Sequence, residues 1–345
     1  MMKKWIAAAF TVILAWNVFL TWSLYHNREN TSEGMHTVEN DDQSYTTDIT
    51  EISDRLRSSV VTVLSDDQSS SGIIIEQDDD TVYILSDADQ LNTKDSAVVR
   101  FDSGAEVSAQ VLGTDKDTDL TLLSLKTDFD VVVPTMGDSD AVSMGEYVIA
   151  LGGRRKENDS AMISYGITSG DGLHRMTYNS SWYTEMLETD AAVTKNNMGG
   201  ALFNIGGDLI GMLCDVPNDG DEEMGYAIGV NEMKLVFHEI KDNGEVTRGI
   251  PGFSCRDVDK MESYEKNEMG LQLDDNSGVL VENVLGDGAV SEVLSSGDVI
   301  TSIDNTRIQD TKSLRTLLYN HKKGDMVAIS YVHEGKSETG EITLQ

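Results

Sequence analysis

Short runs of apolar residues, separated by turn residues, fill the chain from residue 59 to about residue 226. Valine, isoleucine and leucine dominate the runs, and no ten-residue helical pattern lies between them. This pattern is typical of a β-barrel or sandwich and argues against a doubly wound α/β fold. The clearest runs are 60–64, 72–75, 82–85, 97–101, 120–123, 147–151 and 209–213.

Helical spacing appears where this pattern ends. Met233, Phe237 and Ile240 fall on one face of a helix that begins at Asn231, and Gly244 ends it. We expect this helix to close the first domain.

A second series of elements follows Arg248. Strand runs recur at 278–281 and 297–300, a short helix is predicted near 289–294 and a second over 311–321, and two strands end the chain. These elements indicate a small α+β module. Three leucines lie on one face of the second predicted helix: Leu314, Leu317 and Leu318.

The first 25 residues predict a membrane anchor. Lys3 and Lys4 precede an uncharged run over residues 5–24, which as a helix is close to the thickness of about 30 Å of the hydrocarbon core. Trp5 and Trp22 lie near its ends, where interfacial aromatic residues are favoured. The alternative, a cleaved signal peptide, has a shorter apolar core and a site of small residues at its end. The lysines orient the bulk of the protein to the extracytoplasmic side.

An acidic segment follows the anchor. Residues 27–54 contain eight acidic residues and one arginine, with few large apolar side chains, so we expect a solvated stalk. The predicted organisation is an anchor over 1–25, a stalk over 26–50, a first domain over 51–246 and a second over 247–345.

The composition limits the function classes. Among 345 residues, 60 are acidic and 26 basic, which gives a net charge of −34 and excludes a nucleic-acid binder that uses a basic face. Two cysteines, Cys214 and Cys255, exclude a disulfide framework and a cysteine-based zinc site. Either one bridge joins them or they are two buried thiols in separate domains. We expect no cofactor and no metal.

Several collinear strings resemble the HtrA (Deg) family of trypsin-like serine proteases. The resemblance covers residues 58–345 and implies a mainly β fold, a chymotrypsin-like double β-barrel followed by a small α+β PDZ domain. Because such proteins commonly form trimers, it also implies a homotrimer. The matching strings are 59–61, 71–74, 82–86, 117–123, 137–140, 145–152, 164–169, 188–192, 225–231, 247–253 and 297–300.

The resemblance also locates the positions of a catalytic triad. The family's aspartate falls on Asp119, its histidine on Asp89 and its serine on Met198. The loop for the oxyanion falls on Asn196 and Asn197.

Two of the three triad positions therefore lack the required chemistry. A thioether has no proton to lose and is no acyl-transfer nucleophile. No histidine lies between Val60 and Asp119, and no Gly-x-Ser-x-Gly string occurs, so a shifted alignment restores neither group. Asp89 and Asp119 could alternatively form an aspartic dyad or half of a cation site, but a degenerate triad without chemistry is the better interpretation. The acidic residues 218–223 and 78–80 predict a solvated loop and a hairpin tip.

The second module contains a predicted peptide site. In the resembling family, a loop at its start holds a peptide C-terminus with backbone N–H groups. Pro251 removes one donor, and Arg248 is a predicted partner for the carboxylate. Leu314 and Leu318 are equally consistent with core or groove. The loop residues are Ile250, Pro251, Gly252 and Phe253.

These observations lead to one hypothesis and two alternatives. The hypothesis is a membrane-anchored, extracytoplasmic HtrA-like pseudoprotease that binds unfolded polypeptides or protein C-termini, or regulates a partner, in envelope protein quality control. The first alternative is an active HtrA-type serine endopeptidase that degrades misfolded proteins. The second is a PDZ-mediated assembly module.

Overall fold

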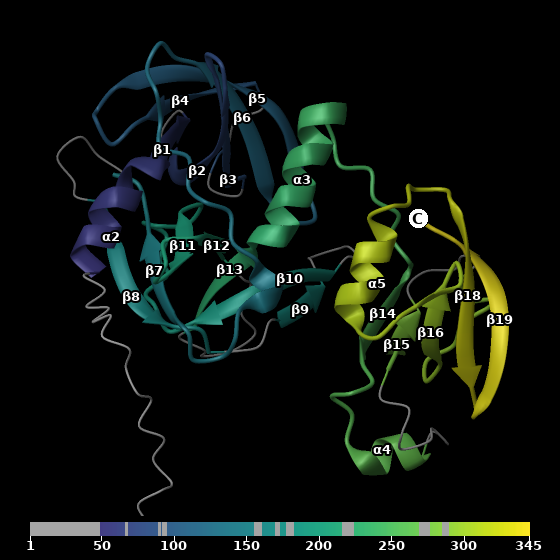
Figure 1. Cartoon of the computed structure of the whole chain (residues 1–345). Helices are drawn as coiled ribbons and strands as arrows, with labels where there is room; N and C mark the ends of the chain where they lie inside the picture. The colour runs from purple at the N-terminus through teal and green to yellow at the C-terminus, as the bar shows by residue number, and fades with distance from the viewer. Residues whose placement is uncertain are drawn as a thin grey trace, which may run out of the picture. The chain divides into compact units, whose positions relative to one another are not determined.

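The structure is a computed structural model of the whole chain. It describes residues 49–65, 68–88, 91, 95–154, 161–169, 173–176, 183–215, 224–268, 277–284 and 290–345 (Figure 1). The predicted anchor, most of the predicted stalk and the acidic loop at 218–223 lie outside these residues. In the described part, no helix is long and apolar enough to span a membrane.

Six antiparallel strands form a closed barrel in the order β1-β2-β3-β6-β5-β4. Their inward side chains are branched aliphatic residues such as Val63, Ile74, Ile84 and Leu123, which are fully buried. The predicted hairpin tip at 78–80 is confirmed. The strands are β1 (Val60–Ser65), β2 (Gln68–Asp78), β3 (Thr81–Asp87), β4 (Ser96–Arg100), β5 (Glu106–Asp115) and β6 (Leu120–Lys126).

A second sheet has seven strands in the order β8-β7-β11-β12-β13-β10-β9. An isolated bridge from Thr168 to Thr189 brings the end of β8 beside the end of β10. The strand pairings in both sheets are antiparallel, and an isolated parallel bridge joins Met136 to Leu209. The strands are β7 (Tyr147–Leu151), β8 (Ile163–Ile167), β9 (Leu173–Met176), β10 (Tyr183–Thr189), β11 (Ala201–Asn204), β12 (Leu209–Cys214) and β13 (Gly225–Gly229).

Helix α3 (Val230–Asn243) packs against strands of both sheets, namely β5, β6, β12 and β13. Met233, Phe237 and Ile240 are buried on its inner face, as predicted. Gly244 takes the left-handed conformation at φ 80° and its N–H donates to the carbonyl of Ile240, which ends the helix. Before the first barrel lie helix α2 (Ile49–Leu56) and the short helix η1 (Arg57–Ser59), and η2 (Ser139–Ala141) lies between the sheets in the chain.

The C-terminal domain is a sheet in the order β14-β15-β16-β18-β19, with β17 paired to β16. Helix α5 (Thr311–Leu318) covers its core, but it ends at Leu318 and not at residue 321 as predicted. Helix α4 (Ser263–Glu268) has no apolar periodicity in the sequence and was not predicted. The short helix predicted near 289–294 is wrong: residues 290–293 form a turn, in which the carbonyl of Val290 accepts from Val293 and Leu294. The strands are β14 (Phe253–Asp257), β15 (Val279–Val284), β16 (Val299–Ile303), β17 (Thr306–Arg307), β18 (Met326–His333) and β19 (Lys336–Thr343).

The two cysteines lie in different domains. Cys214 ends β12 and Cys255 lies in β14, and both are free and buried. The open choice between one bridge and two buried thiols is therefore decided in favour of two thiols.

Candidate functional site

Asp119 lies at the end of the turn that joins β5 to β6. Its backbone is in the left-handed region at φ 55°, which aspartate tolerates better than most residues, and its side chain is exposed. The carbonyl of Asp119 accepts a hydrogen bond of 2.7 Å from the N–H of Ala88. The structure thus places Asp119 beside the residue that precedes Asp89, although Asp89 itself lies outside the described residues.

Met198 is buried in the loop before β11, with 6% of its surface exposed. Its carbonyl accepts hydrogen bonds from the Ser71 N–H at 3.0 Å and from Ser70 Oγ at 3.3 Å. The carbonyl of Ser71 in turn accepts a bond of 2.7 Å from Ser86 Oγ on β3. These hydrogen bonds connect the backbone at Met198 to β2 and, through β2, to β3, the strand that precedes Asp89 in the sequence.

The backbone N–H groups of the loop around Met198 are engaged in hydrogen bonds within the protein. An oxyanion site needs N–H groups that point together at an empty position. Here every backbone N–H from residue 196 to residue 200 donates to a protein acceptor. Asn196 donates to Thr194 Oγ1, Asn197 and Met198 to the Thr194 carbonyl, Gly199 to the Leu213 carbonyl, and Gly200 to the Asn197 carbonyl, at 2.8–3.2 Å.

The side chain of Asn197 holds this arrangement in place. It is fully buried, accepts from the Thr194 N–H at 2.7 Å and donates to the Ala192 carbonyl at 2.9 Å. The loop therefore closes on itself as a short helical turn, with an apolar side chain at its end.

The predicted carboxylate loop lies at the start of the C-terminal domain. Ile250 exchanges two backbone hydrogen bonds with Gln345, at 2.8 and 3.1 Å, and Gly252 is left-handed at φ 75°. Phe253 is fully buried in the domain core. Leu314 and Leu318 belong to the same core cluster, with 3% and 2% of their surfaces exposed.

Arg248 precedes the carboxylate loop and is buried, with 6% of its surface exposed. Its guanidinium is paired with the carboxylate of Asp115, and its Nη1 lies 3.6 Å from Asp117. Both aspartates lie shortly before Asp119 in the sequence. Sequence reasoning missed them as partners of Arg248, because Asp115 and Arg248 are 133 positions apart. The contact between Arg248 and a peptide carboxylate stays a prediction.

Two domain families match separate parts of the chain. Residues 70–212 match the trypsin-like peptidase domain, and residues 253–344 match the PDZ domain. The chain is similar to serine proteases of the HtrA type. It is 29% identical over 269 residues to the serine protease Do-like HtrA of Lactobacillus helveticus, an alignment that covers 76% of this chain and 65% of that protein. It is 31% identical to the serine protease Do-like HtrA of Bacillus subtilis, over 76% of this chain and 60% of that protein. The chain thus spans about two thirds or less of the length of these two relatives.

A solved structure gives the same result for the fold. The HtrA-type protease AlgW with tripeptide superposes with a TM-score of 0.67 at 24% identity, covering 86% of this chain and 96% of that chain. At this identity, the likeness shows the fold alone.

Cys214 does not supply the chain with a substitute nucleophile. The thiol is buried, and burial, together with the negative charge of Asp87, raises its pKa far above the ordinary value. A thiol attacks only as the thiolate. Cys214 therefore offers no ready nucleophile beside this loop.

Proposed function

We propose that the chain is a pseudoprotease of the HtrA type, which binds polypeptides or protein C-termini without hydrolysing them. The observation that carries the proposal is Met198, a buried thioether at the position where the family motif has serine. The backbone N–H groups of residues 196–200 support it, because all of them already donate to protein acceptors and none is left to bind a developing oxyanion.

The relatives favour the alternative by their names. Both aligned relatives are called serine proteases, which supports an active HtrA-type endopeptidase more directly than a pseudoprotease. Against this alternative stands the identity of the residues at positions 89 and 198 of this chain. The assembly-module alternative has no observation of its own in the structure.

The two main candidates are separated by a binding and cleavage assay. Fluorescent unfolded casein is incubated with the full chain, and both its anisotropy and its fragment pattern are followed. The proposal predicts a rise in anisotropy with intact casein. Cleavage by the unmodified chain supports the endopeptidase. If casein is neither bound nor cleaved, both candidates are refuted.

A double variant serves as the positive arm. Met198→Ser with Asp89→His restores the residue types of the family motif at both positions. We expect it to bind casein as the unmodified chain does, so any cleavage that it gains reports on chemistry alone.

We propose further that residues 1–25 anchor the chain and place residues 26–345 on the extracytoplasmic side, where the domains act in envelope protein quality control as a homotrimer. The support is the uncharged run at 5–24 behind two lysines. Carbonate extraction of membranes tests the anchor, since an anchored chain stays in the pellet and a cleaved one is released. Light scattering of the detergent-solubilised chain tests the trimer.

A further inference from the structure

A connected cluster of buried charges lies where the barrel domain meets the PDZ domain. Arg248 is its central residue, with 6% of its surface exposed. Besides Asp115 and Asp117, the guanidinium contacts the ring of Tyr319, whose centroid lies 5.5 Å from Cζ. Arg248 thus joins the β5–β6 turn of the barrel to the end of helix α5 in the PDZ domain.

A second set of contacts joins the same helix to α3. The Tyr319 hydroxyl donates to Glu232, and Arg315 Nε lies 3.5 Å from the other oxygen of the same carboxylate. Glu232 has 1% of its surface exposed, and Arg315 has 6%. At the rim, Lys312 Nζ lies 3.8 Å from Asp140.

The electrostatics make these partners depend on each other. Burial raises the pKa of Asp115, while Arg248 and the hydroxyl of Thr118, at 2.6 Å, act in the opposite direction. Burial alone lowers the pKa of Arg248, and its neighbours Tyr319 and Asp115 outweigh that effect. A buried charge that loses its partner is strongly destabilising. The cluster is therefore stable only when it is complete.

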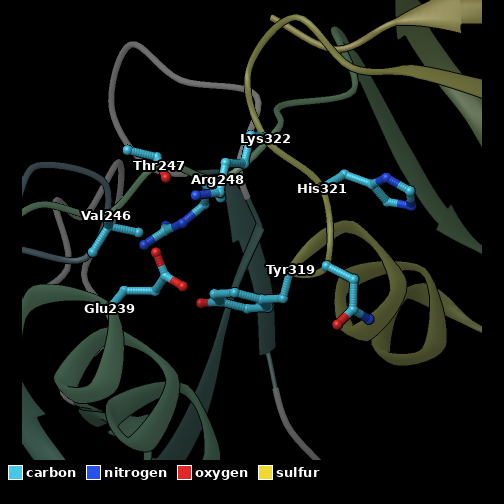
Figure 2. A pocket seen from close by; sticks show the side chains of 8 residues that line it. Glu239, Val246, Thr247, Arg248, Tyr319, His321 and Lys322 are labelled. Carbon is cyan, nitrogen blue, oxygen red and sulfur yellow. The ribbon is translucent and has the colours of Figure 1, made fainter. Parts of the chain in front are cut away.

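The junction leaves little room for a ligand. Figure 2 shows the side chains of Glu239, Arg248 and Tyr319 extending into the same region, while the ring of His321 points away. The cavity that they line has a volume of about 30 Å³, enough for about one water molecule. The cluster is a contact between domains and not a binding site for a small molecule.

We propose that this cluster is a clamp, centred on Arg248, that fixes the PDZ domain to the barrel so that the two domains move and unfold as one unit. Domains joined by a linker otherwise move relative to each other by default. The clamp uses Arg315 of helix α5 and Tyr319 directly after it, whereas Leu314 and Leu318 of the same helix lie in the PDZ core. In this account, Arg248 serves the junction and is not the partner of a peptide carboxylate.

Cleavage of the linker tests the clamp in the full chain. Glu245 lies exposed between α3 and Arg248, so a glutamate-specific endoproteinase reports how often the linker opens. We expect Arg248→Met and Asp115→Asn each to accelerate this cut by about tenfold or more. The double variant should add little, because both single changes open the same clamp. Calorimetry should show one unfolding transition in the unmodified chain and two in either variant.

Two further variants keep the test decisive. Tyr319→Phe removes only one hydroxyl and should change the cutting rate in the same direction by a smaller factor, even where Arg248→Met folds poorly. Arg307→Met is the matched control, because Arg307 is exposed and bonds Ser277 within the PDZ domain. Cutting rates within about twofold of the unmodified chain for both Arg248→Met and Tyr319→Phe overturn the proposal, as does a rate for Arg307→Met that equals theirs.

Discussion

The loop at Met198 and the junction at Arg248 are both buried, but they are held by opposite means. In the loop, backbone N–H groups bond to neighbouring backbone and to Thr194, and the central side chain is an apolar thioether. At the junction, four buried charged side chains meet the hydroxyl of Tyr319, which is half-buried. The comparison teaches that uncharged hydrogen bonds hold the loop at Met198, whereas buried charged side chains are concentrated where the two domains join.

The junction should show the largest effect of a single change. Arg248→Met leaves Asp115 buried without its partner, and we expect a loss of about 3–5 kcal/mol in the free energy of unfolding. Denaturant titration measures it. Adding Asp115→Leu should recover part of the loss, since two apolar residues replace the broken pair. A single-variant loss below about 1 kcal/mol would mean that the charges are not buried as described.

In the loop, the backbone and not the side chain should be sensitive. Gly199 is left-handed at φ 75°, and a Cβ there meets the carbonyl of Ser71 and lies 2.6 Å from Ser70 Oγ. Gly199→Ala should therefore cost about 2–3 kcal/mol, from conformational strain and from the clash. Gly104→Ala is the matched control, because Gly104 has φ 88° and nothing within 4 Å of the added Cβ. Equal losses for the two variants would show that the contact with Ser71 is unimportant.

The hydroxyl of Tyr319 should have an intermediate effect. Tyr319→Phe removes the donor to Glu232 but keeps the ring under Arg248, and we expect a loss of about 1–2 kcal/mol. Tyr264→Phe, at a side chain that is 64% exposed, should change the free energy of unfolding by much less. Thermal unfolding of both variants measures the difference. Equal losses of stability in the two variants would contradict the prediction.

The smallest expected effect is a pH dependence in the PDZ domain. His333 Nδ1 lies 2.6 Å from the buried carboxylate of Asp298, and this hydrogen bond raises the pKa of His333 above its ordinary 6.5. The stabilisation is therefore complete below pH 6.5 and is lost as the pH rises through the raised value. Melting temperatures at about pH 5.5 and about pH 8.5 measure it. His333→Gln should reduce the difference between the two melting temperatures. An unchanged difference would show that the pH dependence arises from other groups.

Local features of the fold follow from the sequence. Helix α3 with its cap at Gly244 and the hairpin tip at 78–80 are predicted by spacing and turn residues, because both depend on neighbours in the chain. The last turn of α5 is wrong in the prediction because Tyr319 still bonds back to Arg315, whereas Asn320 and His321 bond only three residues back.

The surroundings of the candidate sites could not be predicted in the same way. Arg248 and Asp115 are 133 positions apart, and no local pattern indicates their contact. The identity of Met198 is visible in the sequence, but the bonding of the N–H groups around it depends on Leu213 and on the fold of the loop. The sequence thus locates Met198, whereas the hydrogen bonds of the N–H groups around it are seen only in the structure.

The most direct test of the account is labelling with a fluorophosphonate, which reacts with an activated serine nucleophile. Full-length chain, the Met198→Ser plus Asp89→His double variant, and an active trypsin-like protease are exposed to the same probe and examined by intact mass spectrometry. The account predicts no adduct on the unmodified chain and a full adduct on the active protease. A stoichiometric adduct on a serine of the unmodified chain would contradict the pseudoprotease proposal and establish the endopeptidase in its place.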